Sequence, residues 1–478
     1  MPRLYISAAH KSSGKTTISI GLCSLLTQQG YIVQPYKKGP DYIDPLWLSS
    51  ATQRACYNLD YNTMSKNEIL SYVARYSATA DVSIIEGNMG LYDGVAIDGS
   101  NSNAAVAKLT KTPVILVVDA QGVTRGVAPL LQGYQGFDTE LNIAGVLFNK
   151  VANTRHETKL RQMTETYTDL PVVGAVRRSV DLVLTERHLG LQPFNENEQA
   201  QQQIETIAQQ LSEQINIKQI VGYANSVEAL PCLGNNREGN KTNNNNSDND
   251  NDNKINNTKP LRIGICQDAA FSFYYPDDLL ALEQAGAQLI TINTLVDKDL
   301  PYLDGLFIGG GFPEAKMEAL SANITMRKAI AAAIENGLPC YAECGGLMYL
   351  SQSIIWQGKQ QAMVGVIPGD AVMHEKPQGR GYVKLRETAA MPWPKEGDYL
   401  DDKTIAAHEF HYSKLQNTHG KLTKKGAFVY SVQRGTGIDG QNDGWLYKNL
   451  LASYAHIRDT SKYHWASRFV AFIRQQVQ

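Results

Sequence analysis

Short apolar runs alternate with amphipathic stretches along most of this chain. In the first half the runs are rich in β-branched residues and have the length of buried strands, whereas the stretches between them have helical spacing. A helix is expected over residues 15–29. The expected strands are residues 4–8, 82–86, 113–119, 143–149 and 172–176. Strands that alternate with helices are typical of parallel sheets covered by helices, so we expect an α/β domain.

The second half shows the same alternation. Its expected strands are residues 261–266, 305–308 and 338–342, with helices over residues 277–285 and 325–336. Between the halves, residues 235–258 are mostly Asn, Asp, Lys and Gly, and such a segment cannot repay the entropy of ordering itself. We therefore expect two α/β domains, residues 1–232 and 260–478, joined by a disordered linker over residues 233–259.

The composition is that of an ordinary globular protein, with 43% hydrophobic and 19% charged residues in 478. Lys and Arg total 45 against 47 for Asp and Glu, so the net charge of −2 gives no sign of a nucleic-acid-binding surface. No apolar run approaches the roughly 18 to 20 residues of a membrane-spanning helix, and no long apolar stretch opens the chain as in a signal peptide. We expect a cytoplasmic protein.

The six cysteines are scattered and form no CxxC pair. They are Cys23, Cys56, Cys232, Cys266, Cys340 and Cys344. This usage suits a reducing compartment and argues against a zinc cluster. One of the six remains available as a nucleophile.

A Gly-Lys-Thr segment follows the first expected strand and opens the first expected helix, which is the context that a phosphate-binding loop requires. Backbone N–H groups would face phosphate oxygens, Lys15 would neutralise them, and Thr16 would bind magnesium. Ala8 stands where such loops usually begin with Gly, so the loop is atypical. The expected ATP-binding residues here are Ser13, Gly14, Lys15, Thr16 and Thr17.

Acidic residues follow at three places. Asp41 and Asp44 lie three residues apart in a turn marked by Gly and Pro, Glu86 ends the strand 82–86, and Asp93 lies in the segment Gly-Leu-Tyr-Asp-Gly. Each acid alone also fits a turn or a helix cap. Together with the lysine loop they predict a magnesium site at the carboxyl edge of the sheet, where ligands of α/β proteins bind.

Asn149 ends the expected strand 143–149. Its amide would hydrogen-bond the edge of adenine there. An Asn just past a strand is equally an ordinary turn residue, and the sequence leaves both interpretations open.

One cysteine lies at the apex of a tight turn between an apolar strand and a new helix, in the segment Leu-Pro-Cys-Tyr-Ala-Glu-Cys-Gly-Gly over residues 338–346. Such a turn exposes its apex side chain, and the helix N-terminus would lower the pKa of the thiol. Cys344 is therefore the candidate nucleophile, although a lone cysteine is otherwise a buried small hydrophobe. The backbone of Gly310, Gly311 and Gly345 would approach an oxyanion, with a plain loop as the alternative at the first two.

A nucleophilic thiol needs a base, and His408 and His411 lie close together late in the same half. If they belong to a strand, their side chains point to opposite sides, so only one of them serves the thiol. Either is equally well explained as a structural histidine.

Seven motifs occur in order along the chain. They are GPDYIDP (39–45), EGNMGLYDG (86–94), ERHLGL (186–191), DAAFSFYYPDDL (268–279), GGFPE (310–314), AECGGLMYL (342–350) and HEFHYS (408–413). With these motifs the chain resembles the cobyrinic acid a,c-diamide synthases, which join a P-loop domain like dethiobiotin synthetase to a class I glutamine amidotransferase domain. The resemblance covers nearly all of the chain except the Asn-rich linker.

The resemblance implies a carbon–nitrogen ligase that uses ATP, Mg²⁺ and glutamine to amidate the a and c acetates of a tetrapyrrole. It implies that Asp41, Asp44 and Glu86 serve the magnesium and phosphoryl chemistry, and that Asp44 and Asp93 help to bind or activate the substrate. Cys344 would be the nucleophile and His411 its base, with a supporting part at most for His408. A homodimer is compatible with this expectation.

Some residues depart from the cobyrinate enzymes and look more like a sirohaem-amidating branch associated with dissimilatory sulfite reductase. They are His10, Lys11, Ser12, Ser13, Lys38, Asn88 and Gly309. Cobyrinic acid is the expected substrate, sirohaem the alternative, and nickel-sirohydrochlorin a third choice. The first half also resembles ATPases that act as switches, but a pure switch has no use for the Cys344 turn.

Overall fold

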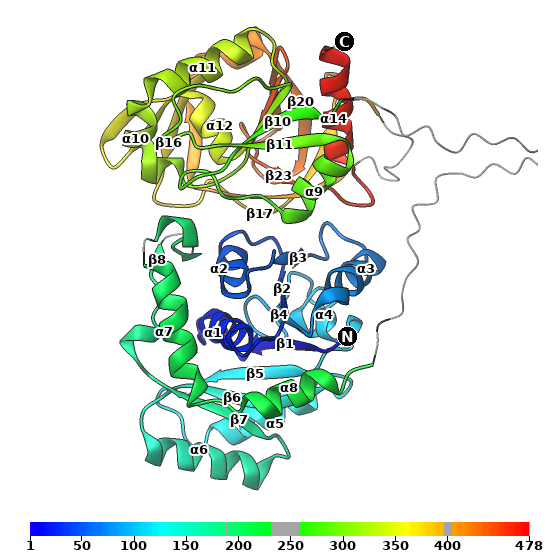
Figure 1. The fold of residues 1–478 in the computed structure, drawn as a ribbon, viewed down its shortest axis with the longest axis vertical. Helices are drawn as coiled ribbons and strands as arrows, with labels where there is room; N and C mark the ends of the chain where they lie inside the picture. Colours follow the sequence, from blue (N-terminus) through cyan, green and yellow to red (C-terminus); the bar gives the residue numbers. More distant parts are fainter. Residues whose placement is uncertain (188–189, 198, 229, 231–258, 396–403, 478) are drawn as a thin grey trace, which may run out of the picture. The chain divides into compact units, whose positions relative to one another are not determined.

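The computed structural model describes residues 1–478 except 188–189, 198, 229, 231–258, 396–403 and 478. The chain divides into two compact units, Met1–Cys232 and Leu233–Gln478 (Figure 1). Apart from residue 259, the expected linker lies outside the described residues, so its boundaries stay a prediction. The α/β class of both halves is confirmed.

Unit 1 is built on a seven-stranded sheet in the order β3-β2-β4-β1-β5-β6-β7, and every neighbouring pair is parallel. The central strand β1 is buried along its whole length, as expected for a parallel sheet covered on both faces. The strands are β1 (Arg3–Ala8), β2 (Val33–Lys38), β3 (Tyr57–Leu59), β4 (Val82–Glu86), β5 (Val114–Asp119), β6 (Ile143–Val151) and β7 (Val172–Arg177).

Eight helices are described in unit 1. They are α1 (Lys15–Gln28), α2 (Ile43–Thr52), α3 (Lys66–Tyr76), α4 (Asn103–Leu109), α5 (Val127–Phe137), α6 (Thr154–Tyr167), α7 (Ala200–Ser212) and α8 (Ile217–Asn225). α1 packs closely along α7 (Figure 1). The two helices approach at Gly21, where a Cβ would lie only 2.2 Å from Leu211 Cδ1, so there is no room for a larger side chain. α1, which begins at Lys15, also packs on β1, β2 and β4 of the sheet.

The five strands expected in this half are confirmed within two residues at each end. The pattern did not single out β2, because its sequence VQPYKK contains Pro35 and two lysines. β2 is nevertheless buried along its whole length, since Lys37 is neutralised by acidic residues from neighbouring segments.

Unit 2 contains a ten-stranded sheet in the order β11-β10-β12-β13-β22-β21-β20-β17-β18-β23. The first five strands pair in parallel, and the remaining pairs with recorded register are antiparallel. The strands are β10 (Leu261–Cys266), β11 (Ala287–Ile292), β12 (Gly305–Ile308), β13 (Cys340–Glu343), β17 (Gly379–Glu387), β18 (Ile405–His411), β20 (Ala427–Arg434), β21 (Asn442–Tyr447), β22 (Leu450–Ser453) and β23 (His456–Ile457).

The expected parallel sheet accounts for the first five strands of this half, and antiparallel strands that were not expected extend it. Strands such as β17 alternate between buried and exposed residues, which is the pattern of antiparallel strands with one solvated face. The three strands expected from apolar runs, near residues 261–266, 305–308 and 338–342, all belong to the parallel part, together with β11 and β22.

A second, four-stranded sheet of unit 2 has the order β15-β14-β16-β19. Its strands are β14 (Ser351–Trp356), β15 (Lys359–Ala362), β16 (Ile367–Met373) and β19 (Ser413–Gln416). The helices are α9 (Pro276–Gln284), α10 (Met317–Ala322), α11 (Ile324–Glu335), α12 (Gly345–Leu350), α13 (Lys421–Lys425) and α14 (Trp465–Gln476). α9 and α11 match the two expected helices within one residue.

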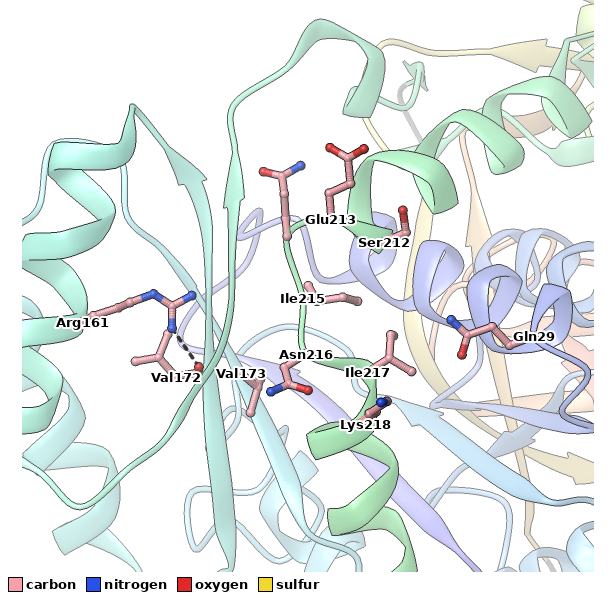
Figure 2. A pocket seen from close by; sticks show the side chains of 11 residues that line it. Gln29, Arg161, Val172, Val173, Ser212, Glu213, Ile215, Asn216, Ile217 and Lys218 are labelled. Carbon is pink, nitrogen blue, oxygen red and sulfur yellow. Dashed lines mark hydrogen bonds between the residues drawn. The ribbon is translucent and has the colours of Figure 1, made fainter.

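A cavity of about 530 Å³ opens on unit 1 beside β7 and the segment that leads into α8. Figure 2 shows its lining, in which the Arg161 guanidinium donates to the Val172 carbonyl oxygen over 3.1 Å. None of the expected site residues lines this cavity. Within the described part of the chain, no helix combines the length and the apolar character needed to cross a membrane.

Candidate active sites

The Gly-Lys-Thr loop connects β1 to α1, as expected. Gly14 has a φ of 82°, and a Cβ there would lie 2.1 Å from Asn149 Nδ2, so glycine is required for both conformation and space. The Asn149 amide donates to the Ser13 carbonyl oxygen over 2.9 Å. Asn149 lies inside β6 and braces the loop, while its contact with adenine stays a prediction.

Residues from three separate segments meet beside this loop, at the carboxyl edge of the sheet. Lys15 Nζ lies 3.2 Å from Glu86 Oε1. The Thr16 hydroxyl donates to Glu86 Oε1 over 2.7 Å and lies 3.3 Å from Asp44 Oδ2. The structure thus brings together the lysine loop and two of the acids that the sequence singled out.

Lys37, at the end of β2, is a central member of the cluster that sequence reasoning missed. Its ammonium contacts the Asp44 carboxylate and lies 3.1 Å from Glu86 Oε1 and 3.8 Å from Asp41 Oδ2. Burial alone would lower the pKa of Lys37, but Asp44, Glu86 and Asp41 raise it well above its ordinary value. The available signal was a pair of lysines, Lys37 and Lys38, directly before the Gly-Pro-Asp turn.

The charges in the cluster act strongly on one another. Burial and the nearby Lys37 ammonium lower the pKa of Lys15. Burial would raise the pKa of Asp44, but Lys37 and Lys15 outweigh it, so the net shift is downward. Burial and the Asp44 carboxylate raise the pKa of Asp41 to about 6. Asp44 is therefore held ionised, whereas Asp41 titrates close to neutrality.

The donor set fits a magnesium ion. Glu86 Oε1 serves Lys15, Thr16 and Lys37, whereas its buried Oε2 has no hydrogen-bond partner among the described residues. Hydroxyl and carboxylate oxygens are the ligands that Mg²⁺ prefers. Across the described ranges, no group of three or more His, Cys, Asp or Glu is arranged to hold a metal. That is compatible with magnesium, which usually binds through one or two carboxylates, waters and substrate phosphates.

Asp93 lies in the exposed loop after β4. Its Oδ2 accepts from the Gly90 N–H over 2.9 Å, and a Cβ on Gly90 would lie 2.9 Å from the Ala9 carbonyl oxygen. The loop that carries Asp93 is thus packed directly against the loop that carries Lys15. Thr17 points elsewhere, because its hydroxyl donates to the Leu182 carbonyl oxygen over 3.4 Å.

Cys344 forms the expected sharp turn between β13 and α12. Its φ of 47° and ψ of −99° lie outside the favoured regions for a residue with a side chain. The Cys344 N–H donates to the Ser453 carbonyl oxygen over 2.7 Å, which ties the turn to the end of β22. A strained cysteine between a strand and a helix is the arrangement expected for a nucleophile.

The expectation of a lowered thiol pKa is wrong for this structure. Burial, together with the Glu314 and Glu343 carboxylates, raises the pKa of Cys344 far above its ordinary value. The Gly345 N–H lowers it only in part, and α12 is just six residues long. The thiol is therefore held protonated until another group accepts its proton.

The expected oxyanion glycines lie beside the nucleophile. Gly311 has a φ of 156°, and a Cβ there would lie 2.0 Å from the Ala270 carbonyl oxygen. A Cβ on Gly345 would lie 2.9 Å from the Gly311 backbone nitrogen. The backbone of Gly311 thus runs against the Cys344 turn, and the oxyanion role of these glycines stays a prediction.

His411, the expected base, lies at the end of β18. Its Nδ1 is 2.8 Å from the Ser413 carbonyl oxygen, and its Nε2 is 3.6 Å from Glu409 Oε2. The ring stacks on Tyr454 with centroids 4.0 Å apart. The Nδ1 of His411 thus faces a backbone carbonyl oxygen, whereas its buried Nε2 lies near Glu409 but has no hydrogen-bond partner among the described residues.

His456, at the start of β23, is a second candidate base that sequence reasoning missed. Its Nδ1 lies 3.1 Å from Glu343 Oε2, and a Cβ on Gly310 would lie 2.6 Å from its Cε1. A carboxylate that accepts the Nδ1 proton leaves Nε2 as the basic nitrogen, as in catalytic triads. The available signal was a histidine just after the apolar strand Leu-Leu-Ala-Ser.

His408 lies on the opposite side of β18 from His411. Its ring stacks on that of His456 with centroids 5.0 Å apart. Burial and the neighbouring His456 lower the pKa of His408 well below its ordinary value, so it stays neutral. His408 is therefore placed to support His456 rather than to exchange protons itself.

A buried thiol on a strained turn, a histidine paired with a carboxylate and a glycine loop together define a glutaminase-type site. A lysine loop with clustered acids defines an ATP site, and the two on one chain define an ATP-dependent glutamine amidotransferase. The family described as CobQ/CobB/MinD/ParA nucleotide binding domain matches residues 6–191, and that described as CobB/CobQ-like glutamine amidotransferase domain matches residues 262–462.

Full-length relatives are similar to the whole chain. A cobyrinate a,c-diamide synthase from Magnetococcus marinus is 44% identical over 476 residues, covering 100% of this chain and 98% of the relative. Proteins of the same name from Archaeoglobus fulgidus and Listeria innocua are 38% and 37% identical, and the matches cover at least 96% of each chain. The chain belongs to the cobyrinate a,c-diamide synthase family and is a glutamine-dependent amidating ligase.

Proposed function

We propose that this protein amidates the a and c acetate carboxylates of cobyrinate with ATP and glutamine. The observation that carries the proposal is the presence on one chain of a lysine–carboxylate cluster and a strained nucleophile with an oriented histidine. Full-length similarity to cobyrinate a,c-diamide synthases supports the choice of substrate. A switch ATPase has no use for the second site.

In the glutaminase half-reaction, the Cys344 thiol attacks the side-chain amide carbon of glutamine, and a histidine accepts the thiol proton. We assign the base to His456, because Glu343 orients its ring, with His411 as the alternative. The N–H groups near Gly310 and Gly311 stabilise the oxyanion. The same histidine protonates the leaving ammonia, and water then hydrolyses the thioester to glutamate.

In the synthetase half-reaction, a substrate carboxylate attacks the γ-phosphoryl group of ATP, and ADP leaves. Lys15 and Lys37 stabilise the charge that develops on the phosphoryl oxygens. Thr16 and Glu86, with Asp41, would hold a magnesium ion, which supplies further neutralisation of the phosphates when bound. Ammonia then displaces phosphate from the acyl phosphate and forms the amide.

Asp44 and Asp93 are assigned to the substrate side of this site. Asp44 is already ion-paired with Lys37, so it sets the position of that ammonium as well as its charge. Asp93 is exposed on a loop that packs against the lysine loop, so its carboxylate is accessible to a substrate. Two amidations in turn consume two molecules each of ATP and glutamine.

The test is incubation of the purified protein with ATP, magnesium and glutamine plus either cobyrinic acid or sirohaem, with product mass as the readout. Conversion of cobyrinic acid to its diamide is the expected result. Amidation of sirohaem alone would move the protein to the sirohaem branch, and glutamine hydrolysis without either product would point to the nickel substrate. Absence of any glutamine hydrolysis would contradict the assignment as an amidotransferase.

A further inference from the structure

The buried carboxylate of Asp443 holds the end of β22. Asp443 lies in β21 and is completely buried. Its Oδ2 accepts from the Ser453 hydroxyl over 2.8 Å and from the Ala455 N–H over 2.9 Å, and its Oδ1 accepts from the Tyr454 N–H over 3.0 Å. Among the described residues Asp443 forms no ion pair, and apart from the neighbouring Gly444 N–H its hydrogen-bond donors are the hydroxyl and backbone N–H groups of this short segment.

This carboxylate replaces the strand pairing that ends just before it. β21 and β22 pair from Tyr447 and Leu450 up to Trp445 and Ala452. Gly444 then adopts a φ of 65°, a left-handed conformation that turns the backbone out of the ladder. The Asp443 side chain takes over as acceptor for the next N–H groups of the neighbouring strand, which would otherwise be buried without partners.

The segment that Asp443 holds, Ser453 to Ala455, is the part of unit 2 on which the thiol site is assembled. The Ser453 carbonyl oxygen accepts the Cys344 N–H, and Tyr454 stacks on His411. His456 follows directly and pairs with Glu343. Cys344 and His411 thus contact these three residues, and His456 is the next residue along the chain.

We propose that Asp443 is a positioning residue of the glutaminase: by fixing Ser453, Tyr454 and Ala455 it sets the distance between the Cys344 thiol and its histidine. The inference rests on the proposed function but not on which histidine is the base. A base has to come within about 2.6–3.2 Å of the proton that it removes. When a substitution far from the reacting atoms displaces a catalytic group by about 1 Å, the rate falls on the order of 100-fold.

The test compares Asp443→Asn with Asp439→Asn in the full-length protein. Asp439 makes the same kind of contact, because its Oδ1 accepts from the Gln441 and Asn442 N–H groups, but it is exposed and lies on a turn without site residues. In Asp443→Asn an NH₂ group replaces one acceptor oxygen. We expect kcat for glutamine hydrolysis to fall about 100-fold with KM for glutamine unchanged.

Two further readouts separate positioning from damage to the fold. Amidation driven by ammonium chloride should keep its wild-type rate in Asp443→Asn, and alkylation of Cys344 by iodoacetamide should shift to higher pH. Ser453→Ala, which removes one of the bonds to Asp443, should change both glutamine hydrolysis and alkylation in the same direction by a smaller amount.

If Asp443→Asn hydrolyses glutamine at the wild-type rate and Cys344 is alkylated with the wild-type pH profile, the inference is overturned. Equal loss of the glutamine-driven and ammonia-driven reactions would also overturn it, because such a loss indicates damage to the whole fold rather than displacement of the thiol site. The wild-type protein is assayed first, and a lack of glutamine hydrolysis there counts against the proposed function rather than against the role of Asp443.

Discussion

The two sites of this protein treat buried charge in opposite ways. In unit 1, the ammonium groups of Lys15 and Lys37 lie among carboxylates, and Asp44 is held ionised. In unit 2, the Cys344 thiol is surrounded by the carboxylates of Glu314, Glu343 and Glu409, which raise its pKa in addition to the effect of burial. The first site pairs opposite charges, whereas the second opposes the formation of a charge.

This difference shows what each half-reaction requires. Phosphoryl transfer needs fixed positive charge before the substrate arrives, since its transition state carries charge on several oxygens. Attack on an amide needs a thiolate only at the moment of reaction. A thiol that its surroundings keep protonated therefore reacts little with other electrophiles. The comparison predicts that the two sites fail separately when single residues are changed.

The largest effect is expected for Cys344→Ser. Because the serine hydroxyl is a much weaker nucleophile in this setting, glutamine-dependent amidation should fall by about 10⁴-fold or more. Amidation supplied with ammonium chloride should persist, since the site of unit 1 is untouched. Rates are measured by product formation with each nitrogen source, and Cys266→Ala, at another buried cysteine, serves as the control. Loss of the ammonia-driven reaction as well would break the separation of the two sites.

Lys37→Met is the counterpart in unit 1. It leaves Asp44 and Glu86 without their shared ammonium, so ammonia-driven amidation should fall about 1,000-fold. The free energy of unfolding should fall by about 3 kcal/mol, because buried charges are left uncompensated. Glutamine hydrolysis by Cys344 should continue.

Product formation and chemical unfolding measure these changes in Lys37→Met. Lys108→Met, which breaks a partly exposed ion pair with Asp138, is the matched control and should change neither quantity strongly. An unaltered rate of amidation in Lys37→Met would show that this lysine only balances charge.

Within unit 2, the two candidate bases for the Cys344 thiol, His456 and His411, can be told apart by substitution. His456→Asn should lower kcat for glutamine hydrolysis about 100-fold, since general-base catalysis contributes at least that much. His411→Asn should change it by less than about tenfold, because its Nδ1 faces the Ser413 carbonyl oxygen and its Nε2 lies 3.6 Å from Glu409 Oε2. Glutamate release is the measurement. The reverse ranking of the two variants would assign the base to His411.

The smallest expected effect is the change that titration of Asp41 in unit 1 makes to the free energy of unfolding. Asp41 has an ordinary pKa of 3.8 and a folded-state pKa of about 6, so the folded protein holds its proton more tightly than the unfolded chain. Its contribution to stability is therefore fully present below about pH 4 and is lost as the pH rises to about 6. Asp41→Asn removes this titration and keeps an acceptor for the Ile43 and Asp44 N–H groups.

The free energy of unfolding of Asp41→Asn relative to wild type should thus increase between about pH 4 and pH 6. The side chain is 32% exposed, so solvent screens the charge, and the increase should be on the order of 1 kcal/mol. Urea unfolding of both proteins at a series of pH values measures it. If the difference in the free energy of unfolding between the two proteins stays constant across this pH range, the raised pKa of Asp41 is contradicted.

Much of both sites could be predicted from local sequence. The Gly-Lys-Thr loop, the acids at residues 41, 44 and 86 and the turn at Cys344 were all found, because each depends on residues next to one another in the chain. Lys37 was missed because a lysine in a polar segment usually lies at the surface. Its burial depends on acids that are 7 and 49 residues further along.

His456 was missed for a related reason. It is 113 residues from Glu343, and nothing in its own segment shows that β22 pairs with β13. The direction of the Cys344 pKa also could not be predicted from the turn alone. The helix N-terminus and the adjacent Glu343 were visible in the sequence, but Glu314 and Glu409, which also raise the thiol pKa, come from separate segments.

The sequence by itself determined the local conformations: the glycine that opens α1, the strained turn of Cys344, and the strands and helices with clear apolar periodicity. These follow from steric preferences that act over a few residues. Only the tertiary structure decided which side chains became neighbours. The order of strands places β4 between β1 and β2, so Glu86 meets both lysines, and it places β22 beside β13, so His456 reaches Glu343. Charge and proton affinity depend on distance and burial, and those quantities exist only once the sheet is assembled.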